Sequence, residues 1–235
     1  TLIRIKVLVV PVLLLIVSCD NRHADKNDAP EYVSDLDDLR MKGKIVAVTD
    51  FNSTNYFIYH GTPMGFHYEL LKSFSSYIGV DVEIIPCNDI NESIELLNTG
   101  EADILAASLA VNNDWDNQVR FTSPVSISRQ VLIQRKPNRW SSMGYGEIEN
   151  SLIRNPELLT GKTVYVQTGS NASKEIHKLS ENYGGRIEII EVPFETEKII
   201  SLVARREIDY AVCDENIALV NSEYYPIIDV ATAID

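Results

Sequence analysis

Basic residues are scarce in this 235-residue sequence, which has 21 Lys and Arg against 34 Asp and Glu and a formal net charge of −13. Phosphate binding needs clustered Lys and Arg, so this balance argues against nucleic acid as a partner. The remaining composition, 45% hydrophobic and 23% charged, is that of an ordinary globular protein. The length suits one large α/β domain or two small ones joined by a hinge.

Cysteine and histidine are also few. The three cysteines form no CxxC motif, and the four histidines show no spacing typical of metal ligands. We therefore expect neither a metal nor another cofactor. Cys87 and Cys213 fall in segments that we assign below to different lobes, so we expect two buried free thiols rather than a disulfide.

Catalytic signatures are lacking too. The sequence contains no GxSxG and no HExxH motif, and no cysteine lies near a plausible histidine partner. Carboxylates are abundant, which leaves a general acid open, but none stands in a recognisable catalytic motif. We therefore assign no catalytic residue to this chain.

The first segment differs from everything after it. Arg4 and Lys6 precede an apolar run over residues 7–17, which is too short for a comfortable transmembrane helix. Residues 16–19 (Ile-Val-Ser-Cys) resemble a bacterial lipobox, which predicts a signal peptide over 1–19 and a lipidated Cys19. A non-lipidated signal or a short N-terminal anchor are the alternatives. The polar, acidic stretch 20–38 is typical of a flexible linker.

From residue 39 onward, short β-rich runs alternate with amphipathic runs of helical spacing. This alternation predicts parallel-rich sheets built from βαβ units. A break near residue 134 divides the series into lobe 1 at 39–133 and lobe 2 at 134–235, with a hinge between Ser128 and Lys136. The strands are expected at 44–49, 80–85, 102–107, 128–134, 161–167, 186–192 and 208–213, and the helices at 66–78, 90–98, 172–183, 196–205 and 215–222.

Four polar loops follow the ends of predicted strands. The ligand of an open parallel sheet lies beyond the carboxyl ends of its strands, where the sequence places the loops 50–57, 108–114, 168–173 and 214–216. Each is rich in Asn, Ser, Thr or Asp. Helix capping and turn formation explain such residues in any single loop. Four such loops at one predicted edge favour a binding site.

The loop 168–173 is the most informative of the four. Gly169 permits a tight turn, and Ser170 and Asn171 open the next helix, where free backbone N–H groups attract an anion. The loop lacks the lysine of a phosphate-binding P-loop, so a carboxylate-sized group fits better. Asp214 ends an apolar strand and could pair with a cationic group, or could simply cap the following helix.

Several segments resemble the family 3 (amino-acid type) extracellular solute-binding proteins in their order and spacing. The resemblance covers residues 39–235 and is carried by 42–48 (KGKIVAV), 63–71 (PMGFHYELL), 97–105 (LNTGEADIL), 121–124 (FTSP), 159–169 (LTGKTVYVQTG) and 207–214 (EIDYAVCD). It implies an α/β fold of the two-lobed, periplasmic-binding-protein-like type II class. The chain ends about where that family crosses back to its first lobe, so we expect the return segment to be missing here.

The resemblance also implies roles for loop residues. Asp214 matches the carboxylate that holds a ligand's α-amino group, Ser170 and Asn171 match residues that bind the ligand's carboxylate, and residues 108–112 match the first-lobe rim. Together with the loop pattern, the predicted ligand-binding residues are Asn55, Tyr56, Ser108, Ala110, Asn112, Trp115, Thr168, Ser170, Asn171 and Asp214.

Trp115 departs from the family pattern. It stands where an arginine is expected to clamp the ligand's carboxylate, directly after Asp114. An arginine fork forms two charge-assisted hydrogen bonds with a carboxylate, and an indole does not. Free α-amino-acid binding is therefore in doubt, and a peptide, a muropeptide fragment or no ligand are the alternatives.

Two functions from different classes remain open. The first is an extracytoplasmic solute-binding or sensor module that closes two lobes around a small polar ligand, anchored by lipid to the outer membrane and working with an ABC permease or with peptidoglycan. The second is enzymatic, because residues 105–113 and 214–219 resemble the N-terminal sensor module of membrane-bound lytic murein transglycosylases. The catalytic domain of those enzymes is absent from this sequence. A dehydratase is a third reading that no motif supports.

Overall fold

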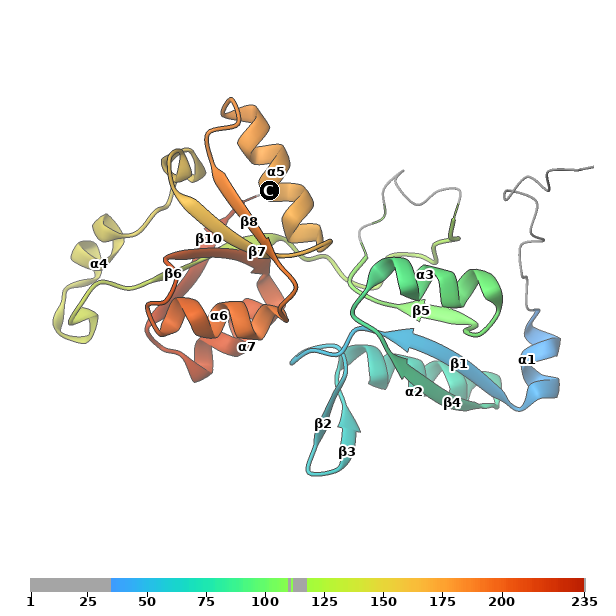
Figure 1. Ribbon diagram of the computed structural model, residues 1–235. Coiled ribbons are helices and arrows are strands. Elements are labelled where there is room, and N and C mark those ends of the chain that lie inside the picture. The colour runs from blue at the N-terminus through green and yellow to red at the C-terminus, as the bar shows by residue number, and fades with distance from the viewer. Residues whose placement is uncertain (1–34, 110, 112–117, 235) are drawn as a thin grey trace, which may run out of the picture. The chain divides into compact units, whose positions relative to one another are not determined.

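The computed structural model describes residues 35–109, 111 and 118–234, all of which belong to one compact unit. They form two main β-sheets with helices packed against each (Figure 1). We call the three-stranded sheet and its helices lobe 1, and the five-stranded sheet and its helices lobe 2. The mixed α/β architecture with parallel-rich sheets is the fold class that the sequence predicts.

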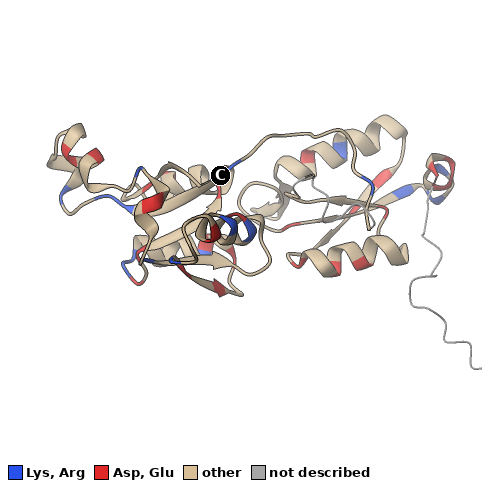
Figure 2. Ribbon diagram, turned by 90° about the horizontal axis from the view of Figure 1, so that it is seen from above, with Lys and Arg blue, Asp and Glu red and all other residues tan. Residues whose placement is uncertain are grey.

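Lobe 1 is a parallel sheet in the order β4-β1-β5, and α2 and α3 cover its opposite faces (Figure 2). Ile45, Ile78 and Val80 pack together in its core. In chain order its elements are α1 (Leu36–Lys42), β1 (Lys44–Thr49), β2 (Phe57–Tyr59), β3 (Thr62–Met64), α2 (Phe66–Ile78), β4 (Asp81–Pro86), α3 (Ile90–Thr99) and β5 (Ile104–Ala106). The predicted strand 44–49 and helix 66–78 are confirmed with the same bounds.

Lobe 2 is a mixed sheet in the order β10-β6-β9-β7-β8. β7 is parallel to both β8 and β9, whereas β6 is antiparallel to both β9 and β10. In chain order its elements are β6 (Gln130–Arg135), a 3₁₀ turn at Trp140–Ser142, α4 (Tyr145–Ser151), a 3₁₀ turn at Pro156–Leu159, β7 (Thr163–Gln167), α5 (Asn171–Asn182), β8 (Glu188–Val192), α6 (Thr196–Ala204), β9 (Tyr210–Asp214), α7 (Glu215–Tyr224) and β10 (Ile228–Ala233).

The core of lobe 2 lies on both faces of this sheet. Along β6, Val131 and Ile133 enter the cluster formed with α6 and α7, while Leu132 enters the cluster formed with α5. This is the two-residue alternation of a strand. All three side chains are fully buried. A continuous apolar run is what a strand covered on both faces requires.

Sequence reasoning misplaced two boundaries. α1 begins inside the segment predicted to be linker, because Asp35 caps its first turn and the Asp38 side chain accepts from the Asp35 N–H at 3.2 Å. β6 pairs over its whole length within the lobe 2 sheet. A lobe boundary between residues 133 and 134 would therefore cut a continuous strand, and the sheet pairing favours a boundary ahead of Gln130.

Three elements and one burial state also differ from expectation. Neither α1, the β2–β3 hairpin nor β10 was predicted from the sequence. Of the two predicted buried thiols, Cys213 is buried and Cys87 is partly exposed, and both are free.

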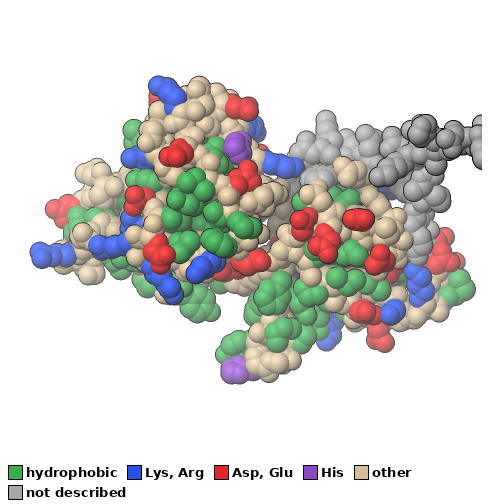
Figure 3. Space-filling model, viewed as in Figure 1, with side chains coloured by type: hydrophobic (Ala, Val, Ile, Leu, Met, Phe, Trp, Pro, Cys, Tyr) green, Lys and Arg blue, Asp and Glu red, His purple; other side chains and the backbone are tan. Residues whose placement is uncertain are grey.

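Hydrophobic side chains gather over the hairpin surface (Figure 3), where Ile58, Tyr59 and Met64 are exposed. Within the described ranges, no helix has the length and apolarity needed to cross a membrane. The predicted signal segment 1–19 lies outside those ranges.

Gly65 fixes the loop after β1 against the start of α2. The carbonyl oxygen of Asn55 accepts hydrogen bonds from the backbone N–H groups of His67 and Tyr68, at 3.0 and 3.2 Å. Gly65 has φ +124°, and a Cβ at this position would lie 2.4 Å from the same oxygen. The close approach is possible only without a side chain.

Gly65→Ala is therefore expected to destabilise the protein by about 2–4 kcal/mol, because it adds a backbone clash to an unfavourable φ. Gly61 is the matched control, since it also has a positive φ but its Cβ would meet nothing within 4 Å. Gly61→Ala should cost only about 1 kcal/mol. Urea unfolding followed by circular dichroism measures both. Equal losses would show that the contact with Asn55 is unimportant.

Candidate functional site

The loop after β1 is organised around the carboxylate of Asp50. Asn55 donates from Nδ2 to Asp50 Oδ2 at 2.8 Å and to Ser108 Oγ at 2.9 Å, which ties this loop to the one after β5. Asn52 also donates to Asp50 Oδ2, at 2.7 Å. Two predicted site residues, Asn55 and Ser108, are thus brought into direct contact. Asn55 is only 6% exposed, so its amide serves the loop's structure.

His67 completes the same cluster from α2. Its Nδ1 lies 3.2 Å from Asp50 Oδ1 and 3.5 Å from Thr49 Oγ1, and the ring is buried. Sequence reasoning assigned no role to His67 or Asp50. The one local sequence feature that could have indicated this turn is Asn52. Its Oδ1 accepts hydrogen bonds from the N–H groups of Thr54 and Asn55, as in an Asx turn.

Tyr56 lies inside lobe 1. Its ring centroid is 6.0 Å from that of Phe51 and 5.9 Å from that of Tyr68, and the residue is 9% exposed. Tyr59 is exposed in the hairpin and packs edge-on against His60. The aromatic residues of this loop are therefore spread over separate places.

In lobe 2, the helix start predicted to bind an anion is engaged by the protein's own groups. Ser170 is the N-cap of α5: its Oγ accepts from the N–H of Ser173 at 3.1 Å and donates to the carbonyl of Gln167 at 2.8 Å. Asn171 donates from Nδ2 to the carbonyl of Ser108 in lobe 1, at 2.5 Å. Thr168 continues the pairing of β7 and β8, with its N–H bonded to the carbonyl of Val192.

A carboxylate that the sequence did not reveal lies beside this helix start. Glu191 accepts from Ser173 Oγ at 2.7 Å and lies 3.1 Å from His177 Nε2, both through Oε1. Its Oε2 accepts from the N–H of Gly169 at 3.4 Å. The hydrogen bond from Ser173, followed by those from His177 and Gly169, holds the pKa of Glu191 below its usual range despite some burial. Glu191 is therefore an anion at neutral pH.

Asp214 lies at the end of β9 as predicted. It caps α7 by accepting from the N–H of Asn216 at 2.9 Å, and its other oxygen accepts from Ser128 Oγ at 2.6 Å. The pairing of Gln130 with Asp214 in β6 and β9 brings Ser128 into reach. Capping is thus confirmed as one role of Asp214, and the residue is partly exposed.

Loops of both lobes meet near these residues. Besides the bond between Asn171 and Ser108, the N–H of Ser53 donates to Glu197 Oε1 at 2.7 Å, and Asn221 Nδ2 donates to Ser53 Oγ at 3.2 Å. Among the predicted site residues, Asn55 and Ser108 of lobe 1 are therefore joined by hydrogen bonds to Asn171 of lobe 2. Ala110, Asn112, Trp115 and the predicted lipidation site Cys19 lie outside the described residues.

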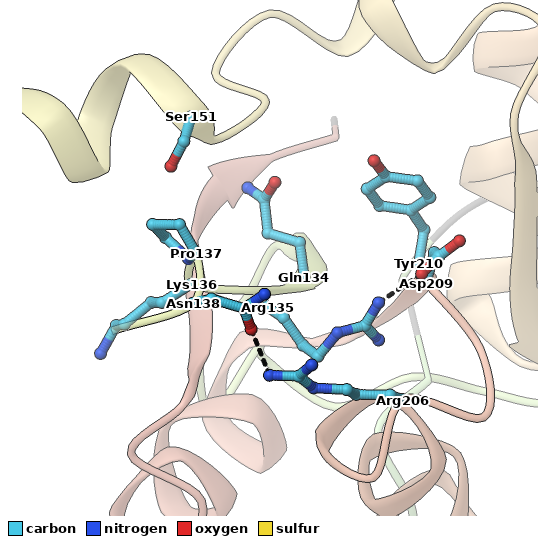
Figure 4. A pocket seen from close by; sticks show the side chains of 9 residues that line it. All are labelled: Gln134, Arg135, Lys136, Pro137, Asn138, Ser151, Arg206, Asp209 and Tyr210. Carbon is cyan, nitrogen blue, oxygen red and sulfur yellow. Dashed lines mark hydrogen bonds and ion pairs between the residues drawn. The ribbon is translucent and has the colours of Figure 1, made fainter. Parts of the chain in front are cut away.

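A separate cavity of about 270 Å³ lies at the opposite edge of the lobe 2 sheet, where β6 ends and β9 begins (Figure 4). It is rich in cationic side chains, but these have partners. Arg135 bonds to the carbonyls of Val203 and Ile208 and to Asp209, and Arg206 bonds to Asn138. We therefore place the candidate site at the edge where the loops after β7 and β9 lie, and not at this cavity. Among the described residues, no group of His, Cys, Asp and Glu side chains has an arrangement suited to a metal ion.

Comparison with known proteins identifies the family. Residues 44–186 match the family model of bacterial extracellular solute-binding proteins, family 3. The chain belongs to this family. The match spans β1 to the end of α5 and so includes the loops of Asp50, Ser108 and Ser170.

Relatives and solved structures extend this result. A protein of Desulfosudis oleivorans named membrane-bound lytic murein transglycosylase F is 32% identical over 197 residues, covering 84% of this chain and 40% of that protein. The chain spans about two fifths of the length of the curated relatives it matches.

Solved structures of similar fold are amino-acid-binding proteins. An ancestral arginine-binding protein bound to arginine aligns with a TM-score of 0.69 and 23% identity over 82% of this chain and 80% of that one. An ancestral amino acid-binding protein described as a precursor of cyclohexadienyl dehydratase aligns with a TM-score of 0.70 and 21% identity, over 85% and 82%. At these identities the likeness establishes the two-lobed type II fold.

The lowered pKa of Glu191 makes a prediction about pH. A carboxyl group whose pKa is lower in the folded state adds stability above its unfolded pKa of about 4.3 and loses it as pH falls through the folded value. Replacing Glu191 by Gln removes this contribution. The difference in melting temperature between the wild type and Glu191→Gln should therefore become smaller as the pH falls from about 6 to about 3. A gap that stays constant over this range would contradict the assignment.

Proposed function

We propose that this chain is an extracytoplasmic solute-binding module that takes a small polar ligand at the carboxyl-terminal edges of its two sheets. The observation that carries the proposal is the convergence of polar loops from both lobes within a member of the solute-binding family. A ligand that touches both lobes stabilises the arrangement in which the loops meet, which is how such modules respond to binding.

Asp214 is the proposed anchor for a cationic group of the ligand. It is partly exposed, it ends a central strand, and Ser128 and the N–H of Asn216 hold its position. An ionised carboxylate accepts about four hydrogen bonds, and these two leave capacity for a ligand's ammonium group. Ser170 and Asn171 are the second proposed contact in lobe 2, while Asn55 and Ser108 form the lobe 1 wall. The sequence positions Tyr56, Ala110, Asn112, Trp115 and Thr168 stay proposed contacts.

The ligand class is an amino acid or a molecule that carries one, such as a peptide or muropeptide. Support comes from the arginine-binding and amino-acid-binding proteins that share the fold. Trp115 stands against a plain α-amino acid, because an indole offers no bidentate partner for a carboxylate. A panel of amino acids, short peptides and muropeptides therefore forms the screen.

Asp214→Asn tests the site without removing the helix cap, because Asn and Asp cap helices about equally well. We expect little change in unfolding free energy and a loss of at least tenfold in affinity, measured by titration calorimetry with whichever panel ligand binds. Asp35→Asn is the matched control, since Asp35 caps α1 ahead of β1, away from the carboxyl-terminal edge. If Asp214→Asn bound as tightly as wild type, the assignment of this anchor would be wrong.

A second candidate function is supported by the relatives. Those named membrane-bound lytic murein transglycosylase F match this chain over only part of their own length. We propose, as the alternative, that the chain is the regulatory N-terminal part of a peptidoglycan lytic transglycosylase. The codons after Asp235 distinguish the two: a continuing frame that encodes a lysozyme-like domain with a catalytic Glu supports the enzyme. Neighbouring genes for a permease and an ATPase support uptake instead.

The lipid anchor is a further proposal, which the lipobox-like residues 16–19 support. Cells that express the chain should incorporate radioactive palmitate into it, and Cys19→Ser should abolish the label and release the protein from the membrane fraction. Unchanged labelling in Cys19→Ser would exclude Cys19 as the acceptor. An outer-membrane location, with peptidoglycan or a permease as partner, rests on the same proposal.

A further inference from the structure

Positive charge is concentrated in two turns of lobe 2, although the chain as a whole has a net charge of −13. Residues 134–139 and 205–210 hold five of the 21 Lys and Arg and only two of the 34 Asp and Glu. The pairing of Gln134 with Tyr210 in β6 and β9 brings the two turns side by side. The five cations of this basic edge are Arg135, Lys136, Arg139, Arg205 and Arg206.

The cavity of about 270 Å³ lies between these turns (Figure 4). Its lining contains the cations Arg135, Lys136 and Arg206 and a single carboxylate, that of Asp209. Arg135 forms an ion pair with Asp209, and its Nη1 donates to two backbone carbonyls at 2.9 and 2.5 Å. Arg135 therefore holds the two turns together, and its charge is balanced by Asp209.

The other cations of the basic edge are held by neutral groups. Arg206 donates from Nη2 to the side-chain oxygen of Asn138. Lys136 donates from Nζ to the carbonyl of Pro226 at 2.8 Å, and its Nζ lies 4.4 Å from the centroid of the Trp140 six- and five-membered ring system. Such partners fix a side chain without neutralising it. Within the described part of the chain, Arg135 is the one member of this group that forms an ion pair.

The backbone at two of these arginines is strained. Arg139 and Arg206 have φ values of 62° and 69°, and His60 is the only other described residue besides glycine with a positive φ. This left-handed conformation is unfavourable for a residue with a long side chain, and Gly or Asn adopts it more easily. Both arginines are also exposed. Strain of this kind at exposed cations indicates that the guanidinium groups serve binding and not the fold.

We propose that the cavity and its surrounding cations bind a phosphate group, which either a free phosphate ester or a phospholipid head group can supply. Arg206 and Lys136 bind it at the cavity, and Arg139 and Arg205 adjoin these contacts along the chain. A phosphate monoester carries a charge of about −1.5 to −2 at neutral pH, so it requires several cations. The guanidinium fork matches the spacing of its oxygens. This site is separate from the proposed solute site and acts independently of it.

Titration calorimetry on the full chain tests the proposal and distinguishes the two sources. Inorganic phosphate and glycerol 3-phosphate represent the free anion. Dihexanoyl phosphatidylglycerol, a soluble short-chain lipid, represents the head group, and dihexanoyl phosphatidylcholine is its control because its choline group neutralises the phosphate. Binding of the first pair identifies a free phosphate ester as the ligand. Preference for the phosphatidylglycerol over both the free anions and the phosphatidylcholine identifies a lipid head group. If none of the probes binds, the proposal is wrong.

The double variant Arg139→Asn with Arg206→Asn locates the site. Asn tolerates the left-handed conformation, so the urea unfolding midpoint should change little, while the affinity for the probe that binds should fall at least tenfold. Lys178→Gln with Lys198→Gln is the matched control, since it removes the same charge from α5 and α6 at exposed positions that do not line the cavity. An equal loss in both double variants would show general attraction by net charge and would overturn the site.

Two further variants keep the result interpretable. Arg205→Gln changes an exposed residue outside the cavity lining, so it should weaken the same probe several-fold even if the double variant folds poorly, and unchanged affinity would contradict the proposal. Asp214→Asn should leave the affinity for phosphate unchanged, because Asp214 lies at the opposite edge of the sheet. Loss of phosphate binding in Asp214→Asn would place the anion at the solute site instead and overturn the inference alone.

Discussion

The antiparallel pairing of β6 with β9 is the constraint on which lobe 2 and its site depend. It places Gln130 opposite Asp214, so the chain enters the lobe directly beside the carboxylate that caps α7. Ser128, just ahead of the strand, can then hold Asp214. The pairing is stabilised by side chains buried on both faces, with Leu132 on one side and Ile133 on the other. The position of a polar site residue is thus set by apolar packing.

Each lobe holds one carboxylate in a similar manner. Asp50 follows β1, the central strand of lobe 1, and Asp214 ends β9, the central strand of lobe 2. Asn52 and Asn55 donate to the first, while Ser128 and a backbone N–H donate to the second. Short polar side chains therefore fix each carboxylate against its own lobe.

The regular elements were predictable because their signals are local. The run 44–49 is apolar and β-branched, and Gly79 ends the helix that begins at Phe66, so both were predicted with correct bounds. The hairpin was missed because its strands have three residues each and its turn, at His60 and Gly61, was taken for part of a loop. β10 was missed because it depends on pairing with a strand about a hundred residues earlier.

The candidate site was predictable only in part, for the same physical reason. The sequence placed Asp214 and Ser170 correctly at the ends of strands, since strand ends follow from the hydrophobic pattern. It gave no indication of Glu191, whose partners Gly169 and Ser173 lie about twenty residues away along the chain. Nor did it show that His67 meets Asp50. Such contacts arise from tertiary packing, which no local pattern encodes.

The order of strands has a consequence for how lobe 2 is made. β6 leaves the ribosome first among the strands of its sheet, yet both of its partners, β9 and β10, come last. Until residue 210 is synthesised, the apolar run 131–133 has neither of the strands with which it pairs. Contacts so distant along the chain form slowly, and unpaired apolar strands aggregate. The interval between the synthesis of β6 and that of β9 is therefore the one in which this strand is most open to aggregation.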